Sequence, residues 1–380
     1  MEHREDKIQM GGQAVIEGVM MRSPTGYCIA VRKKDKSIKL KSVPYSPLTR
    51  RIKILGLPFL RGVVTLFEML VIGLKGLDFS VNEWEGDHPK EKEGKKAEEP
   101  ETEAKANPPN PGSPQKDEKN TIPEPKRQIS LPAMVGLMTF SLALALVLTV
   151  VLPNILTHLA GKVFTLGKAK EILNAGPGGL VEERSPLLYN LIAGFFRAVI
   201  LVTYIWVISL SRDIRRVFEY HGAEHKAVFA FEDAKPLTLE NIRPYSTRHP
   251  RCGTTFLGVV IIISIIIFAF IAWLVTLVYP PFHGLKLVFR KMIIMALHIV
   301  FMPLVAGISY EIIKYGSKHL DNPLTRLLTY PGLLSQHITT RKPDDEQLEV
   351  SIASLEGAMA ISPGQKEPIL SVLSPNHAPD

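Results

Sequence analysis

The chain has 380 residues, of which 46% are hydrophobic, and it carries 45 basic and 37 acidic residues for a net charge of +8. Its mean hydropathy is nevertheless positive, at +0.12, so the apolar residues must be concentrated in segments. This excludes an ordinary soluble enzyme, a disulfide-rich scaffold and a fully disordered chain. The two cysteines, Cys28 and Cys252, indicate a reducing compartment. No nucleic acid is needed to explain the basic balance, because Lys and Arg accumulate on the cytoplasmic side of membrane proteins.

Residues 1–54 are expected to form a cytoplasmic segment without a cleavable signal peptide, since residues 1–10 contain no apolar stretch. The segment contains the glycine-flanked run GGQAVIEGVMMR, which matches neither the dinucleotide-binding nor the P-loop pattern. Gln13, Glu17 and Arg22 are candidates for lining a site, because glycine lets the backbone approach a ligand closely. The alternative is a first β-strand over residues 14–21 with turn glycines.

Residues 55–79 are apolar, but Arg61, Glu68 and Lys75 recur every seven residues and share one helical stripe. We therefore expect an interfacial or re-entrant helix here rather than a membrane span. Residues 80–127 are rich in Glu, Lys, Pro and Asn. Such a composition buries too little apolar area to offset chain entropy, so the segment is expected to be a disordered charged linker.

Residues 128–338 are expected to form a transmembrane bundle. Residues 131–152 and 256–279 are free of charge and exceed the roughly 18 apolar residues that mark a span. Residues 187–210 contain Arg197, which costs about 2.5 to 3.5 kcal/mol, but the apolar residues around it return about 4 to 8 kcal/mol. A shorter fourth candidate covers residues 292–308 and continues to Glu311.

The basic residues predict the orientation of these spans. The loop 211–255 carries eight Lys and Arg, against four in residues 153–186, so the former is expected inside. With four spans, both termini are then cytoplasmic in a multi-pass protein of the cell (inner) membrane. The expected fold class is a mainly α integral membrane protein, with about four transmembrane helices, the helix at 55–79 and a small cytoplasmic α+β part.

The strongest local pattern is EYHGAEHK at residues 219–226. His221 and His225 stand four residues apart, so on a helix both imidazoles project from one face, as two ligands of one metal require. Glu224 completes the order H-x-x-E-H of the inverted zincins, in which the glutamate is the general base. Gly222 weakens the helix by up to about 1 kcal/mol. The alternative is a solvated polar helix just inside the membrane.

Downstream, RHPRCGTT at residues 248–255 offers His249 and Cys252 three residues apart. Both side chain types bind zinc, the metal that we expect. Alternatively Cys252 is a nucleophile whose thiolate the flanking arginines would stabilise, or a small buried residue beside positive-inside anchors. Glu311 is a further candidate, either as the distal carboxylate ligand of an inverted zincin or as a salt-bridged residue at a helix end.

The cytoplasmic tail, residues 339–380, contains TTRKPDDEQ, in which Asp344 and Gln347 have the spacing of a helix N-cap and its N3 partner. The apolar residues that follow mix the periods of strand and helix.

Taken in order, GGQAVIEGVMMRSP, YHGAEHKAVFAFE, RHPRCGTTF and GISYE resemble the bacterial YqhQ-like family, as does the tail PGLLSQHITTRKPDDEQLEVSIASL. The resemblance implies an integral membrane protein of unknown function that is labelled a predicted metal-dependent enzyme. By motif match it makes His221, Glu224, His225, His249 and Cys252 the candidate metal-site residues. It names no substrate.

Three functions remain open. The first is a metal-dependent membrane hydrolase acting on a peptide or a lipid-linked substrate, with His221 and His225 as ligands and Glu224 as base. The second is a non-catalytic scaffold or assembly factor, in which four protein ligands would close a structural site. The third and weakest is a transporter, supported only by Arg197 and Glu311 within apolar segments.

Overall fold

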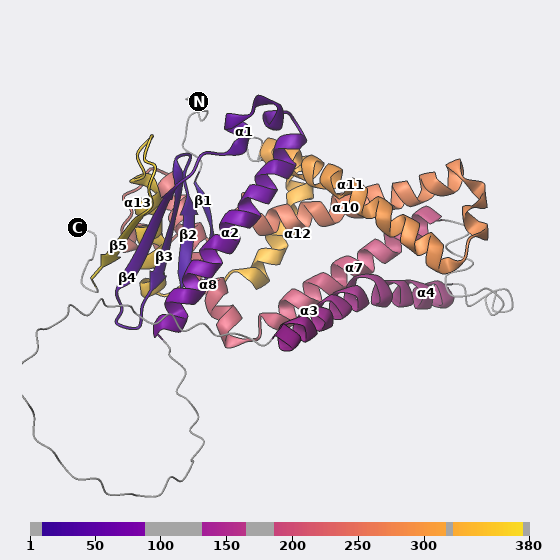
Figure 1. The fold of residues 1–380 in the computed structure, drawn as a ribbon, viewed down its shortest axis with the longest axis horizontal. Coiled ribbons are helices and arrows are strands. Elements are labelled where there is room, and N and C mark those ends of the chain that lie inside the picture. The colour runs from indigo at the N-terminus through magenta and orange to yellow at the C-terminus, as the bar shows by residue number, and fades with distance from the viewer. Residues whose placement is uncertain (1–9, 88–130, 165–185, 317–321, 375–380) are drawn as a thin grey trace, which may run out of the picture. The chain divides into compact units, whose positions relative to one another are not determined.

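The computed structural model describes residues 10–87, 131–164, 186–316 and 322–374 (Figure 1). The chain divides into a large unit, residues 1–88 and 147–380, and a small one, residues 89–146. The described part of the small unit is one helix, α3 (Leu131–Leu146).

The described part of the chain is mainly helical and contains a five-stranded antiparallel sheet in the order β1-β2-β3-β4-β5. In place of the single strand over residues 14–21 that the sequence offers as one alternative, the structure has a hairpin that turns at Ile16 and Glu17, and Glu17 has a positive φ of 50°. The last strand comes from the C-terminal tail and pairs with β4. The strands are β1 (Gly11–Val15), β2 (Gly18–Arg22), β3 (Gly26–Arg32), β4 (Ile38–Pro44) and β5 (Ile369–Leu373).

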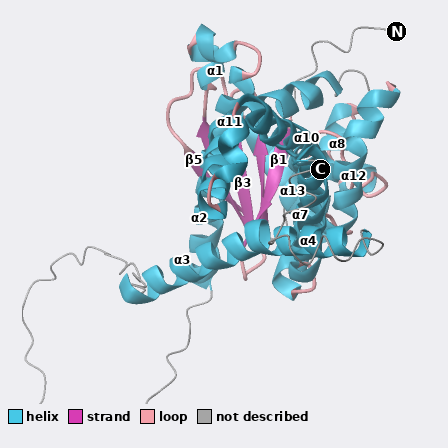
Figure 2. Ribbon diagram, turned by 90° about the vertical axis from the view of Figure 1, so that its right-hand side faces the viewer, coloured by secondary structure: helices cyan, strands magenta, loops and turns pink. Residues whose placement is uncertain are grey.

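The sheet lies between helices on both faces, as Figure 2 shows. Side chains alternate along a strand, so in β3 Ile29 and Val31 pack toward Ile72 of α2 (Leu60–Asp87). Cys28 and Ala30 pack on the other face, against α8 (Arg212–Glu232) and α13 (Asp345–Met359). The α/β part is therefore three layers thick, and α8, which carries the H-x-x-E-H pattern, is one of its core helices.

Helix α2 extends to Asp87, beyond residue 79, although the composition predicts a linker from residue 80. The added turns contact the sheet: Ser80 Oγ accepts a hydrogen bond from the Ile16 amide, and Glu83 forms ion pairs with Lys33 and Lys39. The remainder of the expected linker, residues 88–127, lies outside the described residues. Before α2 come the short turns α1 (Leu48–Arg51) and η1 (Lys53–Gly56).

Among the described residues, four helical segments are long and apolar enough to cross a membrane, as the sequence predicts. The fourth is longer than expected, because α11 (Leu287–Gly316) continues through Pro303. The first includes a π-helical turn, η2 (Val147–Val151), which leads into α4 (Leu152–Phe164). The four segments are Thr139–Thr157, Leu187–Ile208, Gly253–Val278 and Val288–Gly316.

Helix α10 (Gly253–Val278) is the centre of the bundle and packs against α7 (Pro186–Ile208), α11 and α12 (Pro323–Thr339). It meets α12 at two glycines, where a Cβ on Gly258 would lie 2.6 Å from the Cα of Gly332. Small residues allow such close helix crossings. The crossing places the last turns of α12 beside the start of α10, which is where Cys252 lies.

The C-terminal tail belongs to the α/β part of the fold. The predicted capping box at Asp344 and Gln347 is present at the start of α13. Within α13, the Ser354 hydroxyl contacts the Met21 amide and the carbonyl oxygens of Val19 and Cys28, all within 3.0 Å. Helix α13 is therefore tied to β2 and β3 by polar contacts inside an apolar core.

We expect Gly332→Ala to destabilise the protein, because the added Cβ would overlap the backbone of Thr255. Overpacking of this kind typically costs about 1–3 kcal/mol. The measurement is the thermal unfolding midpoint of detergent-purified protein. Gly86→Ala in α2 is the control, since a Cβ added there would meet nothing within 4 Å; equal midpoints for the two variants would contradict the close crossing.

Candidate functional site

The H-x-x-E-H residues lie on one uninterrupted helix, α8. Gly222 does not break it, and the structure shows why a glycine stands there. A Cβ at this position would overlap the Arg341 carbonyl oxygen, and the Arg341 amide donates to Phe218 O at 2.9 Å. The absence of a side chain thus lets the segment between α12 and α13 run directly against α8.

Both histidines of the pattern are oriented by backbone carbonyls. His221 Nδ1 lies 2.8 Å from Thr339 O, and His225 Nδ1 lies 2.6 Å from Thr247 O. A carbonyl oxygen only accepts, so in each ring Nδ1 carries the proton and Nε2 has a free lone pair. This is the arrangement that typically orients histidine ligands of metals.

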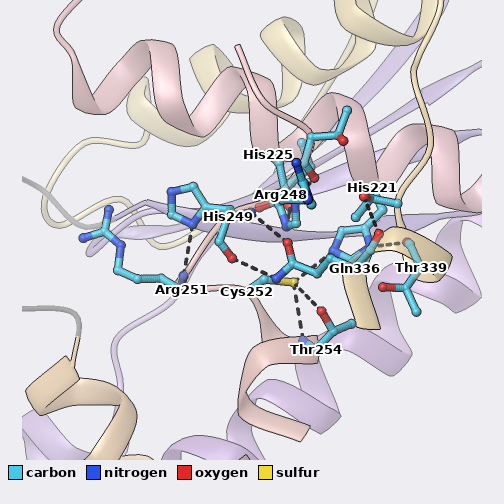
Figure 3. Close-up of polar contacts among 12 residues, drawn as sticks. His221, His225, Arg248, His249, Arg251, Cys252, Thr254, Gln336 and Thr339 are labelled. Atoms are coloured by element: carbon cyan, nitrogen blue, oxygen red, sulfur yellow. Dashed lines mark hydrogen bonds and ion pairs between the residues drawn. The ribbon is translucent and has the colours of Figure 1, made fainter. Parts of the chain in front are cut away.

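Cys252 lies where the Nε2 lone pairs of His221 and His225 are directed. It is the N-cap of α10, where its Sγ accepts from the Thr254 amide at 3.4 Å. His221 Nε2 lies 3.1 Å from Sγ. Ligand atoms of His221, His225 and Cys252 all lie within 4.8 Å of one another, and Figure 3 shows the three side chains converging. We call these three residues the His-His-Cys cluster.

The centre of the cluster is deficient in positive charge. His225 Nε2 is buried and has no hydrogen-bond partner in the described part of the chain. Oε2 of Glu224 lies 3.4 Å from this nitrogen. A lone pair, a carboxylate and a sulfur thus face one another, which is unfavourable unless a cation or proton lies between them. The donor set itself therefore fits a metal ion.

Burial sets the protonation of the neighbouring groups. It raises the pKa of the Glu224 carboxyl, an effect that the imidazoles of His221 and His249 and the Gly12 amide oppose. It lowers the pKa of His225 and of His249, which favours the neutral rings. Neutral imidazole is the form that binds a metal.

The loop between α8 and α10 includes α9 (Leu239–Ile242) and is anchored by side chains of α8 and α12. Lys226 Nζ donates to the carbonyl oxygens of Arg243 and Tyr245. Gln336 of α12 is fully buried; its Oε1 accepts from the His249 amide at 2.8 Å, and its Nε2 donates to His249 O at 2.9 Å and Thr255 Oγ1 at 2.8 Å. Sequence reasoning missed Gln336, because a single glutamine in an apolar helix matches no motif.

His249 is adjacent to the His-His-Cys cluster without belonging to it. Its ring centroid is 5.8 Å from that of His225. Its Nε2 lies 3.3 Å from Glu232 Oε1, and Arg251 pairs with the same carboxylate. His249 is therefore directed toward Glu232 and separated from the position where His221, His225 and Cys252 meet.

Glu311, expected as a possible third ligand, is not brought to this site. Its carboxylate forms a two-pronged ion pair with Arg61 of α2, at 2.7 Å to Nε, and accepts from the Phe59 amide at 3.3 Å. The second alternative, a salt-bridged residue at a helix end, is the one that the structure shows.

Gln13, Glu17 and Arg22 do not line the cluster either. Gln13 Nε2 donates to Gly73 O at 3.1 Å on the α2 side of the sheet. Glu17 pairs with Arg216 at the start of α8. Arg22 contacts Met69 Sδ at 3.0 Å and lies over the Tyr45 ring. The glycine-flanked run contributes Gly12 to the surroundings of the cluster. The lack of a Cβ at Gly12 leaves room for the Glu224 side chain.

Comparison with known proteins gives a family but no activity. A family model described as "Protein of unknown function (DUF1385)" matches residues 57–361. The chain is also 30% identical, over 368 residues, to a Bacillus subtilis (strain 168) protein named "Uncharacterized protein YqhQ"; the match covers 96% of this chain and 97% of that one. No solved structure matches.

The two cysteines are expected to differ in reactivity. Cys28 is fully buried and burial raises the pKa of its thiol to about 11, whereas Cys252 is partly exposed. In folded, chelator-treated protein at pH 7.5, about one thiol should react with a maleimide, and about two after denaturation. Cys252→Ser should abolish the native reaction and Cys28→Ser should leave it unchanged; the reverse pattern would contradict the geometry of the cluster.

Proposed function

We propose a function from the site itself, because the chain belongs to the DUF1385 family, whose description assigns no activity. The proposal is a metal-dependent membrane hydrolase with its site on α8. The observation that carries it is the convergence of His221 Nε2, His225 Nε2 and Cys252 Sγ, with both imidazoles oriented by carbonyl oxygens.

Zinc is the metal that this donor set favours, because imidazole and thiolate both suit it. His221, His225 and Cys252 would hold it. Catalytic zinc sites characteristically use three protein ligands and keep one position open, whereas structural sites close with four. When bound, zinc would supply Lewis acidity for hydrolysis. The cluster offers three protein ligands, and His249, which could have been a fourth, is directed toward Glu232. This number of ligands supports a catalytic zinc site.

Glu224 is the residue proposed as general base. It directly precedes His225 on α8, its Oε2 lies 3.4 Å from His225 Nε2, and it is only 5% exposed. A carboxyl whose pKa burial raises is better matched to proton transfer near neutral pH than an exposed one. A peptide bond or the linkage of a lipid-linked substrate is the class of bond that we propose for cleavage.

The proposed location is the cytoplasmic face of the cell membrane, with both termini inside and the bilayer as the protein's environment. The excess of Lys and Arg in residues 211–255 supports it. Helix α2 is proposed to lie in the interface. Its face away from the sheet is apolar and exposed, including Phe67, Leu70 and Leu74, as an interfacial helix requires.

A second candidate, a structural metal in a membrane scaffold or assembly factor, has a specific observation in its favour. His225 is only 1% exposed, and the cluster joins α8 to the N-terminus of α10 while α12 and its following segment hold both in place. A metal there would stabilise the junction between the α/β part and the helical bundle without any reaction.

Detergent-purified wild-type protein is expected to contain about one zinc ion per chain, measured by elemental analysis. His221→Ala, His225→Ala and Cys252→Ala should each lose it. His337→Ala is the matched control, since that histidine contacts Arg248 outside the cluster, and His249→Gln should also retain the metal. Folded wild-type protein that stays metal-free after reconstitution with zinc would refute the site.

Glu224→Gln separates the two candidate functions. As base, Glu224 can be replaced without loss of zinc, while hydrolysis of a quenched peptide library or a p-nitrophenyl ester falls by about 10²- to 10⁴-fold. Asp213→Asn, an exposed carboxylate on the same helix, is the control. Loss of zinc from Glu224→Gln would make the residue part of the metal site, and a zinc-loaded wild type without hydrolysis would favour the structural function.

A further inference from the structure

We infer that the helical bundle contains a second site, which binds a phosphate group near Arg197 of α7 and His298 of α11. The inference rests on the proposal that these helices span a membrane, but not on the metal site or its chemistry.

Arg197 lies eleven residues from both ends of α7, which at 1.5 Å per residue is about 16 Å from either end. In a hydrocarbon core about 30 Å thick this is the midplane. Its Nε donates to Thr149 O, in the π-helical turn, at 3.3 Å. No other hydrogen bond of this guanidinium is seen among the described residues. Ionisable groups at such a depth are expensive and usually functional.

His298 lies on α11, which packs against α10 as α7 does, and it is eleven residues from the first residue of its helix, as Arg197 is. Its ring stacks on Phe268 with centroids 4.1 Å apart. Its Nε2 is buried and has no hydrogen-bond partner in the part of the chain that the structure describes. Arg197 and His298 therefore lie at the same depth on two helices that pack against α10, and each has a polar nitrogen that could bind a ligand.

Polar side chains lead from this region to one end of the bundle. Lys291 Nζ lies 5.2 Å from the Tyr189 ring centroid, and the Tyr189 hydroxyl donates to Asn154 Oδ1 at 2.8 Å. Tyr189 and Lys291 are close to the first residues of α7 and α11. This end is opposite to the one where α10 begins at the His-His-Cys cluster. The second site would therefore be reached from the other side of the membrane.

The charge of the region specifies its ligand. Within the described spans Leu187–Ile208, Gly253–Val278 and Val288–Gly316, the single acidic residue is Glu311, which is paired with Arg61 near the other end. The guanidinium of Arg197 thus lacks a carboxylate on these helices, and an oxyanion would supply the missing charge. Arginine binds phosphate oxygens with two parallel donors, and a lipid headgroup or a free phosphate ion presents the same group.

The test is the shift in the thermal unfolding midpoint of the full chain in detergent, titrated separately with dioctanoyl phosphatidic acid, inorganic phosphate and uncharged dioctanoylglycerol. Phosphatidic acid, phosphate or both should stabilise the wild type, and the two titrations identify whether the source is a lipid or a free ion. Arg197→Gln should weaken the response about 10-fold, as loss of a charge-assisted hydrogen bond predicts. Arg197→Lys, which keeps the charge but not the planar fork, should weaken it less.

Lys286→Gln is the matched control, because Lys286 is an exposed cation at the same end of the bundle and should leave the response unchanged. An equal response to dioctanoylglycerol, or equal affinities in wild type, Arg197→Gln and Arg197→Lys, would overturn the site. Zinc content is measured on the same samples. If Arg197→Gln loses the phosphate response but keeps the zinc content of the wild type, the two sites are independent. A failure of the phosphate site is then distinguishable from a failure of the metal site.

Discussion

Two carbonyl oxygens, those of Thr247 and Thr339, determine what the histidines of α8 can do. Each accepts the Nδ1 proton of one ring, at 2.6 and 2.8 Å, and so leaves Nε2 without a proton and directed at Cys252. Neither carbonyl belongs to α8: one lies in the loop before α10 and the other at the end of α12. The chemistry of the site therefore depends on two segments being held against one helix, and Gly222 and Gln336 are the residues that allow and enforce this.

Helix α8 serves the core and the site with different faces. Tyr220, Ala223 and Ala227 pack into the apolar core beneath the sheet, while His221 and His225 project toward the start of α10. Because the core fixes how the helix is rotated, the imidazoles have little freedom to move apart. Glu224 is confined in the same way by Gly12 of β1, so the sheet edge that carried the first motif in the sequence contributes to the site by shape rather than by a reactive side chain.

The sequence was informative where a pattern is local and physical. The spacing of His221 and His225 placed both on one helix face, the apolar runs gave the four long helices, and Asp344 with Gln347 gave the start of α13. It was uninformative where contacts join distant segments. Which of His249, Cys252 and Glu311 joins the two histidines depends on tertiary pairing. Only the structure shows that His249 is directed toward Glu232 and that Glu311 is paired with Arg61. Gln336 and the two carbonyl oxygens leave no signature in a sequence, because any residue has a carbonyl and a buried glutamine looks like an exposed one.

The site is also coupled mechanically to the bundle. Gln336 holds the backbone of His249, three residues before Cys252, and it stands one turn beyond Gly332, where α12 crosses α10. The separation of these two helices therefore sets the position of the Cys252 loop relative to α8. The histidines are anchored to the α/β core, whereas Cys252 is anchored to α10. A change in helix packing within the bundle would therefore first displace Cys252 Sγ relative to the two Nε2 atoms. Metal bound across this boundary would in turn restrain the bundle, which gives one physical link between the helices and the α/β part whichever of the two proposed functions holds.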